Sequence, residues 1–337
     1  MAFRISNLVP AILSALPMSL AFALSALAND STAELENGGI VLTRSDGVRL
    51  ISEDLYLSME EVRVDYVFEN RKDTPLETIV AFPMPDLPGG IDRMVALPEG
   101  AGDNFLDFST TIDGVPVEPQ LDQRAVAAGI DVTDDLLAQG VPLNPFGEAT
   151  GNAVKALPDD VKADWVTRGI LAQAVFGGPG KEKTVQFAQW TLRSAYWWPA
   201  IFPAKAQVRV SHRYRPSVGA TASIYLVHDG EPNEYFPEYQ SKYCIDDGFL
   251  SALIKADQRD EHLAEHRLDY VLTSGGNWAN GTIGRFHLTV DKGDVKNLAS
   301  FCGTDVKKTG PTTFEMNVEN YYPEKDIHIL FTSPLNN

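Results

Sequence analysis

Apolar and polar side chains alternate along residues 62–69 of this chain. Every second residue from Val62 to Phe68 is apolar, whereas Arg63 and Asp65 have the opposite parity. A period of two is typical of a strand with one buried face. After the polar turn NRKDTP, a second apolar run over residues 79–82 ends at prolines, which cannot donate to a sheet ladder. The pattern predicts two strands joined as a hairpin, whose apolar faces need a second sheet to cover them.

Short strands of this kind recur along most of the chain. In the N-terminal part we expect strands over residues 40–43 and 48–57, then a hairpin in which Asp113-Gly114 joins residues 105–112 to 115–117. Further strands are expected over residues 184–198, 206–215, 222–227, 268–273, 284–290, 312–318 and 327–332. Closely spaced strands separated by turn residues favour a β-sandwich over an α/β fold.

The composition changes between residues 121 and 183. The segments LDQRAVAAGI, VTDDLLAQG and LPDDVKADWVTRGIL have Ala and Leu at helical spacing, and Gly140 and Gly169 lie where helices commonly end. We therefore predict a mainly β protein, an antiparallel β-sandwich of immunoglobulin-like type with a helical insertion. Residues 29–120 form its N-terminal part, and residues 184–337 continue the sandwich or form a second one.

The first 28 residues have the features of an export signal. Arg4 provides a positive start, an apolar stretch covers residues 8–27, and the sequence ALA ending at Ala28 fits the small-x-small cleavage pattern. Prolines and serines interrupt the apolar stretch, and no stop-transfer pattern follows, which argues against an uncleaved anchor. We expect cleavage between Ala28 and Asn29, a periplasmic or secreted location, and no stable membrane insertion after cleavage.

Charge and cysteine content narrow the class of protein. The formal net charge is −18, which disfavours nucleic acid as a partner because phosphates attract clusters of Lys and Arg. The chain has two cysteines, Cys244 and Cys302. An isolated pair in an oxidising compartment usually forms a disulfide, and a pair of metal-binding thiolates would need further ligands that the sequence does not single out.

One sequence pattern matches a catalytic motif. His262, Glu265 and His266 have the HxxEH spacing of inverted zinc peptidases, in which two histidines hold zinc and the glutamate activates water. The surrounding QRDEHLAEHRLD is highly charged, as a solvated surface helix would be. The surface helix is the favoured interpretation, and no cofactor is predicted.

Aromatic residues are concentrated in one expected strand. Trp190, Tyr196, Trp197 and Trp198 are candidates for stacking on a sugar or a peptide, since exposed rings often mark binding surfaces. A core role is favoured for the cluster as a whole. Adjacent residues of a strand point to opposite faces, so we expect Trp197 and Trp198 to differ in exposure.

Several stretches together are similar to a bacterial secreted family. They are NDSTAEL after the expected cleavage point, SEDLYLSMEEVRVDYVFEN, AFPMPD and GGNWANGTIGRFHLTVDKGDVKNLASFCG. From Asn29 to about Thr332 the chain resembles the family known as domain of unknown function 4424. This resemblance implies export and a common fold, and it brings no known activity or catalytic residue.

A second resemblance covers only the N-terminal part. VDYVFENRKDTPLETIVAFPMP followed by TIDGVPVEPQLDQRAVAAG is similar to the vault/inter-α-trypsin domain, a β-sandwich interaction module, up to about Gly129. That domain usually precedes a von Willebrand A domain, whose sequence pattern does not follow here, so the function does not transfer. The resemblance adds a vault/inter-α-trypsin-like sandwich to the immunoglobulin-like one as a possible type.

Two functions of different class follow from these observations. The favoured prediction is a non-enzymatic binding or scaffolding module of the cell envelope, whose partner is a protein or an envelope glycan. The alternative is a metal-dependent hydrolase that uses His262, Glu265 and His266. The two differ in a spatial property, because a hydrolase needs these three side chains to converge with a fourth group in a cleft.

Overall fold

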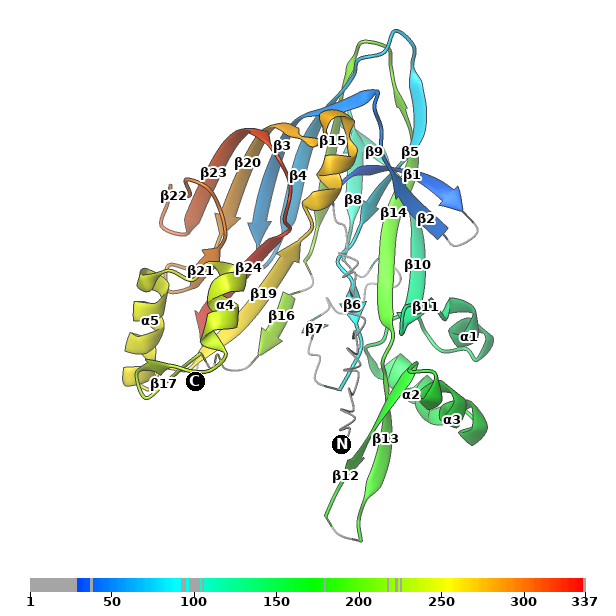
Figure 1. The fold of residues 1–337 in the computed structure, drawn as a ribbon, viewed down its shortest axis with the longest axis vertical. Coiled ribbons are helices and arrows are strands. Elements are labelled where there is room, and N and C mark those ends of the chain that lie inside the picture. The colour runs from blue at the N-terminus through cyan, green and yellow to red at the C-terminus, as the bar shows by residue number, and fades with distance from the viewer. Residues whose placement is uncertain are drawn as a thin grey trace, which may run out of the picture.

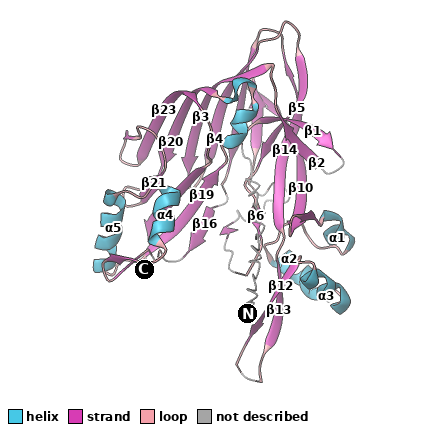
Figure 2. Cartoon of the chain, viewed as in Figure 1, coloured by secondary structure: helices cyan, strands magenta, loops and turns pink. Residues whose placement is uncertain are grey.

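The computed structural model describes most of the chain after the expected export signal. The described residues are 29–36, 39–91, 95–96, 104, 106–178, 180–216, 218–221, 224 and 226–335. The export signal predicted for residues 1–28 therefore lies outside the described residues. Figures 1 and 2 show a mainly β protein, with helices on the outside of the sheets.

The first sheet has the strand order β11-β10-β14-β5-β1-β2, and β6 also pairs with β14. Its strands are β1 (Ser31–Glu36), β2 (Gly39–Thr43), β5 (Leu76–Pro83), β6 (Leu87–Pro88), β10 (Gln120–Ala127), β11 (Ile130–Asp131) and β14 (Thr191–Phe202). All of its pairings are antiparallel.

The second sheet has eight strands in the order β22-β23-β20-β3-β4-β15-β8-β9. They are β3 (Val48–Ser58), β4 (Val62–Asn70), β8 (Ser109–Ile112), β9 (Val115–Val117), β15 (Gln207–Tyr214), β20 (Ile283–Asp291), β22 (Lys307–Lys308) and β23 (Thr313–Tyr321). Strands β3 and β20 pair in parallel, and the other neighbours are antiparallel. Strands from the N-terminal and C-terminal parts of the chain are thus neighbours in one sheet.

The third sheet has the order β21-β24-β19-β16-β7. It contains β7 (Val95–Ala96), β16 (Val218–Thr221), β19 (Leu263–Tyr270), β21 (Leu298–Phe301) and β24 (Ile327–Pro334). Two small sheets stand apart, namely β12 (Leu171–Phe176) with β13 (Lys183–Ala188), and β17 (Val227–His228) with β18 (Glu231–Pro232).

One hydrophobic core is shared by the three large sheets. It takes Phe82 from β5 in the first sheet, Phe286 from β20 in the second and Ile329 from β24 in the third, and all three are buried. The expected mainly β architecture with antiparallel sheets is therefore confirmed, apart from the parallel pair β3–β20, and side chains of three sheets meet in one core.

Helices cover two separate places on this framework. Helices α1 (Thr133–Ala138), α2 (Glu148–Ala156) and α3 (Asp159–Thr167) enclose a second apolar cluster around Trp165 and Trp190. Helices α4 (Phe236–Tyr243) and α5 (Asp247–Gln258) pack a third cluster against Leu330 of β24. The short helices η1 (Thr273–Asn277) and η2 (Ala279–Gly281) follow β19.

The hairpin predicted for residues 60–85 is wrong, although both of its strands exist. Strand β4 pairs with β3 and β15 in the second sheet, whereas β5 pairs with β1 and β14 in the first. The turn NRKDTP connects β4 of the second sheet to β5 of the first. Beside it, a second connection leads from β14 of the first sheet back to β15 of the second. The buried side-chain amide of Asn70 joins the two crossings, because it donates to the carbonyl oxygens of Thr74 at 3.0 Å and Phe202 at 2.8 Å. The two apolar faces therefore cover each other.

The helical insertion predicted over residues 121–183 begins too early and ends too late. Residues 120–127 form β10, which pairs with β14 from Gln120 to Val126, and residues 171–176 form β12. The apolar residues of LDQRAVAAGI fit the period of a helix and also the period of a strand. Pairing with β14 favours the strand, since strand preference depends on tertiary context. The charged helix expected around residues 258–269 is also wrong, because α5 ends at Gln258 and β19 begins at Leu263.

The predicted disulfide is confirmed. Cys244, which follows α4, is bonded to Cys302, which follows β21, with the two Cα atoms 5.0 Å apart. The bond ties α4 to the end of the third sheet. Within the described part of the chain, no helix has the length and apolar character needed to cross a membrane.

Replacing both cysteines by alanine should destabilise the fold. The bond joins positions 58 residues apart, and closing a loop of that size is worth about 4 kcal/mol on the chain-entropy model. Denaturant unfolding of the oxidised protein and of the Cys244→Ala/Cys302→Ala variant measures the difference. Since both cysteines are exposed, little packing is lost, and reduction of the parent protein should have the same effect. An unchanged unfolding midpoint would contradict the prediction.

Candidate functional site

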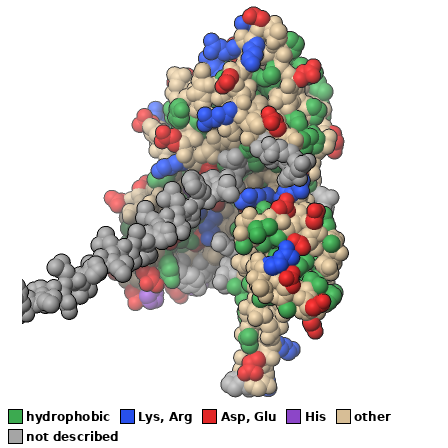
Figure 3. All heavy atoms as spheres, turned by 45° about the vertical axis from the view of Figure 1, so that its right-hand side comes forward, with side chains coloured by type: hydrophobic (Ala, Val, Ile, Leu, Met, Phe, Trp, Pro, Cys, Tyr) green, Lys and Arg blue, Asp and Glu red, His purple; other side chains and the backbone are tan. Residues whose placement is uncertain are grey.

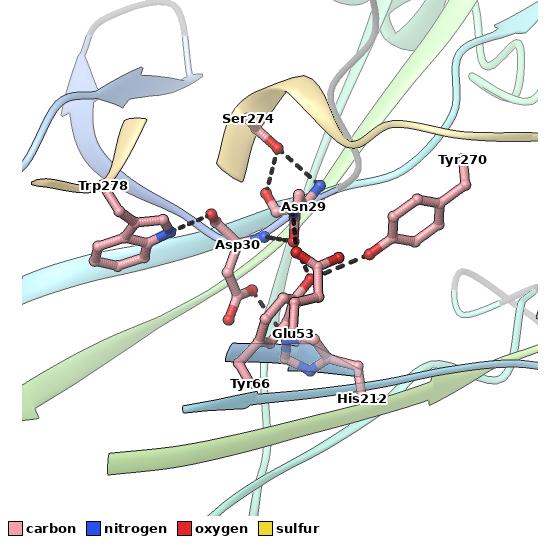
Figure 4. A network of polar contacts seen from close by, with 8 residues as sticks. All are labelled: Asn29, Asp30, Glu53, Tyr66, His212, Tyr270, Ser274 and Trp278. Carbon is pink, nitrogen blue, oxygen red and sulfur yellow. Dashed lines mark hydrogen bonds and ion pairs between the residues drawn. The ribbon is translucent and has the colours of Figure 1, made fainter. Parts of the chain in front are cut away.

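A network of polar side chains lies where the three sheets meet. Figure 4 shows its members, which come from the start of the described chain, from β3, β4, β15 and β19, and from the η1 region. They are Asn29, Asp30, Glu53, Tyr66, His212, Tyr270, Ser274 and Trp278, and every one of them is buried. Such a concentration of polar groups in a core needs partners for nearly every donor and acceptor.

Asn29 is the centre of this network. Its backbone nitrogen donates to the Ser274 Oγ at 2.8 Å, and the Ser274 hydroxyl donates back to the Asn29 carbonyl oxygen at 2.7 Å. Its side-chain amide donates to Glu53 Oε2 at 3.0 Å, and its Oδ1 accepts from the Tyr66 hydroxyl. The Tyr66 hydroxyl also lies 3.1 Å from that of Tyr270. Asn29 thus joins η1 to two strands of the second sheet, β3 and β4.

Local sequence explains how Asn29 can lie so close to η1. A Cβ atom added to Gly275 would stand 2.7 Å from Asn29 Nδ2, which is closer than packed atoms allow. Glycine at this position leaves the space that the Asn29 amide occupies. The next residue along, Gly276, has no such contact, because a Cβ there would meet its nearest neighbours at 3.8 and 3.9 Å.

Asp30 holds the other half of the network. Its Oδ1 lies 2.9 Å from His212 Nε2, and its carbonyl oxygen accepts from Trp278 Nε1 at 2.6 Å. The His212 ring is surrounded by aromatic rings, with centroid distances of 4.8 to 5.6 Å. These rings belong to Tyr66, Phe82, Phe108 and Trp198. Burial raises the pKa of the Asp30 carboxyl, although the nearby His212 opposes this shift.

Glu53 is the second buried carboxyl group. Burial raises its pKa to about 8, the Asn29 amide that donates to it opposes that shift, and the charge of Asp30 adds to it. Burial likewise raises the pKa of the Tyr66 and Tyr270 hydroxyls well above the ordinary value, so both remain neutral. Three atoms of the network lack a hydrogen-bond partner within the described structure: Asp30 Oδ2, Glu53 Oε1 and His212 Nδ1.

This arrangement is a buried hydrogen-bond network that links chain segments and is closed to solvent. A carboxylate that orients a histidine is found in hydrolytic sites, where the other imidazole nitrogen faces a nucleophile. Here His212 is 3% exposed and is enclosed by aromatic rings. A substrate has no approach to it, so the hydrogen bonds of this centre hold chain segments together.

The four aromatic candidates for ligand binding differ in their exposure to solvent. Trp190, Tyr196 and Trp198 are buried, and the Tyr196 ring stacks on Phe108 with the ring centroids 4.3 Å apart. Trp197, on the opposite face of β14, is half-buried. The two adjacent tryptophans thus differ in exposure, and Trp197 is the member of the four that a ligand could reach.

The HxxEH residues do not converge, because β19 is a strand. Glu265 is buried and accepts from the Tyr239 hydroxyl at 2.9 Å, whereas the neighbouring His266 points to the other face and lies 2.9 Å from Ser333 Oγ. His262 precedes the strand and is exposed. Among the residues that the structure describes, no three His, Cys, Asp or Glu side chains gather as ligands for a metal.

An open cleft of about 720 Å³ lies beside the disulfide. Its walls include both cysteines and Tyr322, together with the basic Lys242 and the acidic Asp326. Groups of both signs line this cleft, so its charge does not indicate the sign of a ligand.

Sequence reasoning missed the buried network. Its members come from six places along the chain, and periodicity shows only that Val64, Tyr66 and Phe68 face a core. The signal that was available is the run NDST at residues 29–32, four polar residues in a row that are all buried. A polar run at an expected chain start is usually solvated, and its burial depends on tertiary contacts.

These features define a mainly β protein whose polar centre is enclosed by a core that three sheets share. Residues 28–330 match the family described as Domain of unknown function (DUF4424), so the chain belongs to that family. No match to this chain was found among curated proteins. The resemblance of the N-terminal part to the vault/inter-α-trypsin domain stays a prediction.

Two kinds of solved structure are similar in part. One is a protein of Legionella pneumophila described as a "putative nutrient binding protein", with 14% identity, a TM-score of 0.43, and coverage of 91% of this chain and 72% of that one. The other is an M1 zinc metallopeptidase from Deinococcus radiodurans, with 11% identity, a TM-score of 0.27, and coverage of 86% and 43%. Neither similarity is high enough to bring a function to this chain.

Substituting Gly275 by alanine should destabilise the protein by about 1–3 kcal/mol, because the new methyl group must displace Asn29 or η1. The matched control is Gly276→Ala, where a methyl group has ordinary contacts. Denaturant unfolding of the two variants measures the difference. Equal stability of the two would show that the close approach of Asn29 to Gly275 is unimportant.

Glu53 should make stability depend on pH in a form of the protein whose Asn29 nitrogen is held in a peptide bond. Its folded pKa of about 8 exceeds the ordinary 4.5, so the folded state binds the proton more tightly. The stabilisation is complete below about pH 4.5 and is lost as the pH rises through 8. Unfolding between pH 5 and 8 should show a falling free energy that Glu53→Gln flattens. The exposed Glu34→Gln serves as control, and an unaltered slope in Glu53→Gln would refute the assignment.

Proposed function

We propose that the protein is exported, is cut between Ala28 and Asn29, and acts in the cell envelope as a non-enzymatic binding module. The observation that carries the binding role is the hairpin β12–β13, which projects from the body at the bottom of Figure 1. The disulfide supports the location, because such bonds persist in oxidising compartments. The sandwich type, immunoglobulin-like or vault/inter-α-trypsin-like, remains part of this proposal.

The hairpin displays apolar side chains that the fold does not cover. Val175 is 62% exposed and Phe176 is 49% exposed, near the tip of β12. The base of the hairpin packs against α2 and α3, and the remainder extends into solvent. In Figure 3 the projecting end carries hydrophobic, acidic and basic side chains close together. Apolar groups kept on an extended arm favour contact with a partner over a role in the core.

The geometry favours a protein as the partner. Within the described strands, β12 and β13 pair only with each other, so each has an outer edge along which no other strand is paired. An extended segment of another protein can add to such an edge as a further strand, and side chains such as Phe176 then supply specificity. The sealed polar centre supports the non-enzymatic part of the proposal.

A photo-crosslinking amino acid at position 175 tests the binding role in exporting cells. We expect a discrete protein adduct from position 175 and none from position 201, where Ile201 on β14 is equally exposed at 62%. The adduct should disappear when Phe176→Ser is combined with the probe.

Other outcomes would contradict the proposal. Absence of a protein adduct at position 175, or the same adducts from both positions, would remove the hairpin as a binding surface. Binding to purified envelope glycan that Trp197→Ala abolishes and Phe176→Ser leaves intact would replace the protein partner by a glycan.

A further inference from the structure

The residues that follow the expected cleavage point are among the most deeply buried of the molecule. Asn29, Asp30 and Ser31 have no exposed surface, and Thr32 is 3% exposed. The ends of most domains are exposed and poorly ordered unless specific contacts fix them. Here they are fixed by Ser274, by Glu53 and by the rest of the polar centre (Figure 4). A chain start at Asn29 would therefore lie inside the core.

The charges of this centre are unbalanced as long as Asn29 is an ordinary internal residue. Two buried carboxyl groups, Asp30 and Glu53, face one ionisable base, His212, which contacts Asp30. Among the described residues, no Lys or Arg forms an ion pair with either carboxylate. A buried carboxylate without a counter-charge is costly, so Glu53 must either hold a proton or gain a cation.

The centre also has acceptors that no donor fills. Glu53 Oε1 and Asp30 Oδ2 have no hydrogen-bond partner within the described structure, although both residues are at least 99% buried. Asn29 carries the amide that donates to Glu53 Oε2 and also the nitrogen that donates to Ser274 Oγ. A positively charged group with additional N–H donors at that nitrogen would belong to the same residue whose side-chain amide already donates to the Glu53 carboxylate.

Cleavage creates such a group. Hydrolysis of the Ala28–Asn29 bond by a signal peptidase adds the hydroxyl of water to the Ala28 carbonyl, and the Asn29 nitrogen becomes an ammonium group with three N–H donors. We propose that Ser274 and Glu53 form a binding site for the protein's own α-amino group, which completes the polar centre when the chain is cut. This inference rests on the cleavage proposed above.

The site gives the processed chain a different dependence on pH. The titratable groups of the polar centre around Asn29 are Asp30, Glu53, His212, Tyr66 and Tyr270. A docked ammonium keeps Glu53 ionised at neutral pH, so the loss of stability between pH 5 and 8 disappears. Only the protonated amine can pair with Glu53, so its contribution is lost when the pH rises through the pKa that the amine has in the folded protein.

The experiment uses protein exported through its own signal, whose first residue is read by N-terminal sequencing. In a second form, one glycine is inserted between Ala28 and Asn29, which moves the ammonium out of the site by one residue. Both forms are made in the parent, in Glu53→Gln and in the exposed Glu34→Gln. Insertion should lower the folded-to-unfolded ratio at least about tenfold in the parent, the equivalent of one pKa unit. It should do the same in Glu34→Gln and lower the ratio less than twofold in Glu53→Gln.

A second measurement does not use the glycine insertion, so it tests the site even if the insertion destabilises the protein only by disturbing its packing. Amine-reactive labelling of the native protein at neutral pH should modify the Asn29 nitrogen at least about tenfold more slowly than in the unfolded protein, because a protonated, enclosed amine does not react. Equal rates would overturn the site, and so would an equal loss of stability on insertion in all three backgrounds.

The outcomes also separate this inference from the function proposed above. A first residue other than Asn29 would refute both the cleavage and the site. A chain that begins at Asn29 with a freely reactive amine would refute the site alone and leave the exported binding module standing.

Discussion

The hydrogen bonds of Asn29 and Asp30 are the constraint on which the rest of the structure depends. They join the segment that enters β1 of the first sheet to Glu53 and His212 of the second, and to the Ser274 and Trp278 region that follows β19 of the third. Each buried group would cost about 1–3 kcal/mol if it lost its partner. The three sheets are therefore held in a single relative placement, whereas apolar contacts alone tolerate small displacements.

Different parts of the molecule carry its structural contacts and its exposed apolar side chains. The ionisable side chains His212 and Glu53 are buried, and their hydrogen bonds connect segments of the chain. The solvent-exposed surface, by contrast, consists of a hairpin with apolar side chains and an exterior with many charged side chains (Figure 3). In such an arrangement the core can vary little, while the projecting hairpin can change its side chains at small cost to the fold.

Local pattern predicted much of the fold and almost none of the candidate site. Strands β3, β4, β15 and β20 follow from period-two alternation, and the Asp113-Gly114 turn between β8 and β9 follows from turn chemistry. Pairing could not be read locally, so β4 and β5 were joined as a hairpin although they belong to different sheets. The network depends on contacts such as Asn29 with Ser274, across 245 positions, and no short-range pattern carries that information. The disulfide was foreseeable because the chain offers a single pair of cysteines.

The parallel pairing of β3 with β20 has a consequence for the order of folding. Positions 55 and 288 are register partners in the middle of the second sheet, so one edge of β3 stays open until nearly the whole chain has been made. Sheets closed by such distant contacts form slowly, and an open apolar edge invites association with other chains. A nascent chain of this protein would therefore benefit from a chaperone that shields β3 until β20 arrives, and fragments that end before residue 283 should be prone to aggregate.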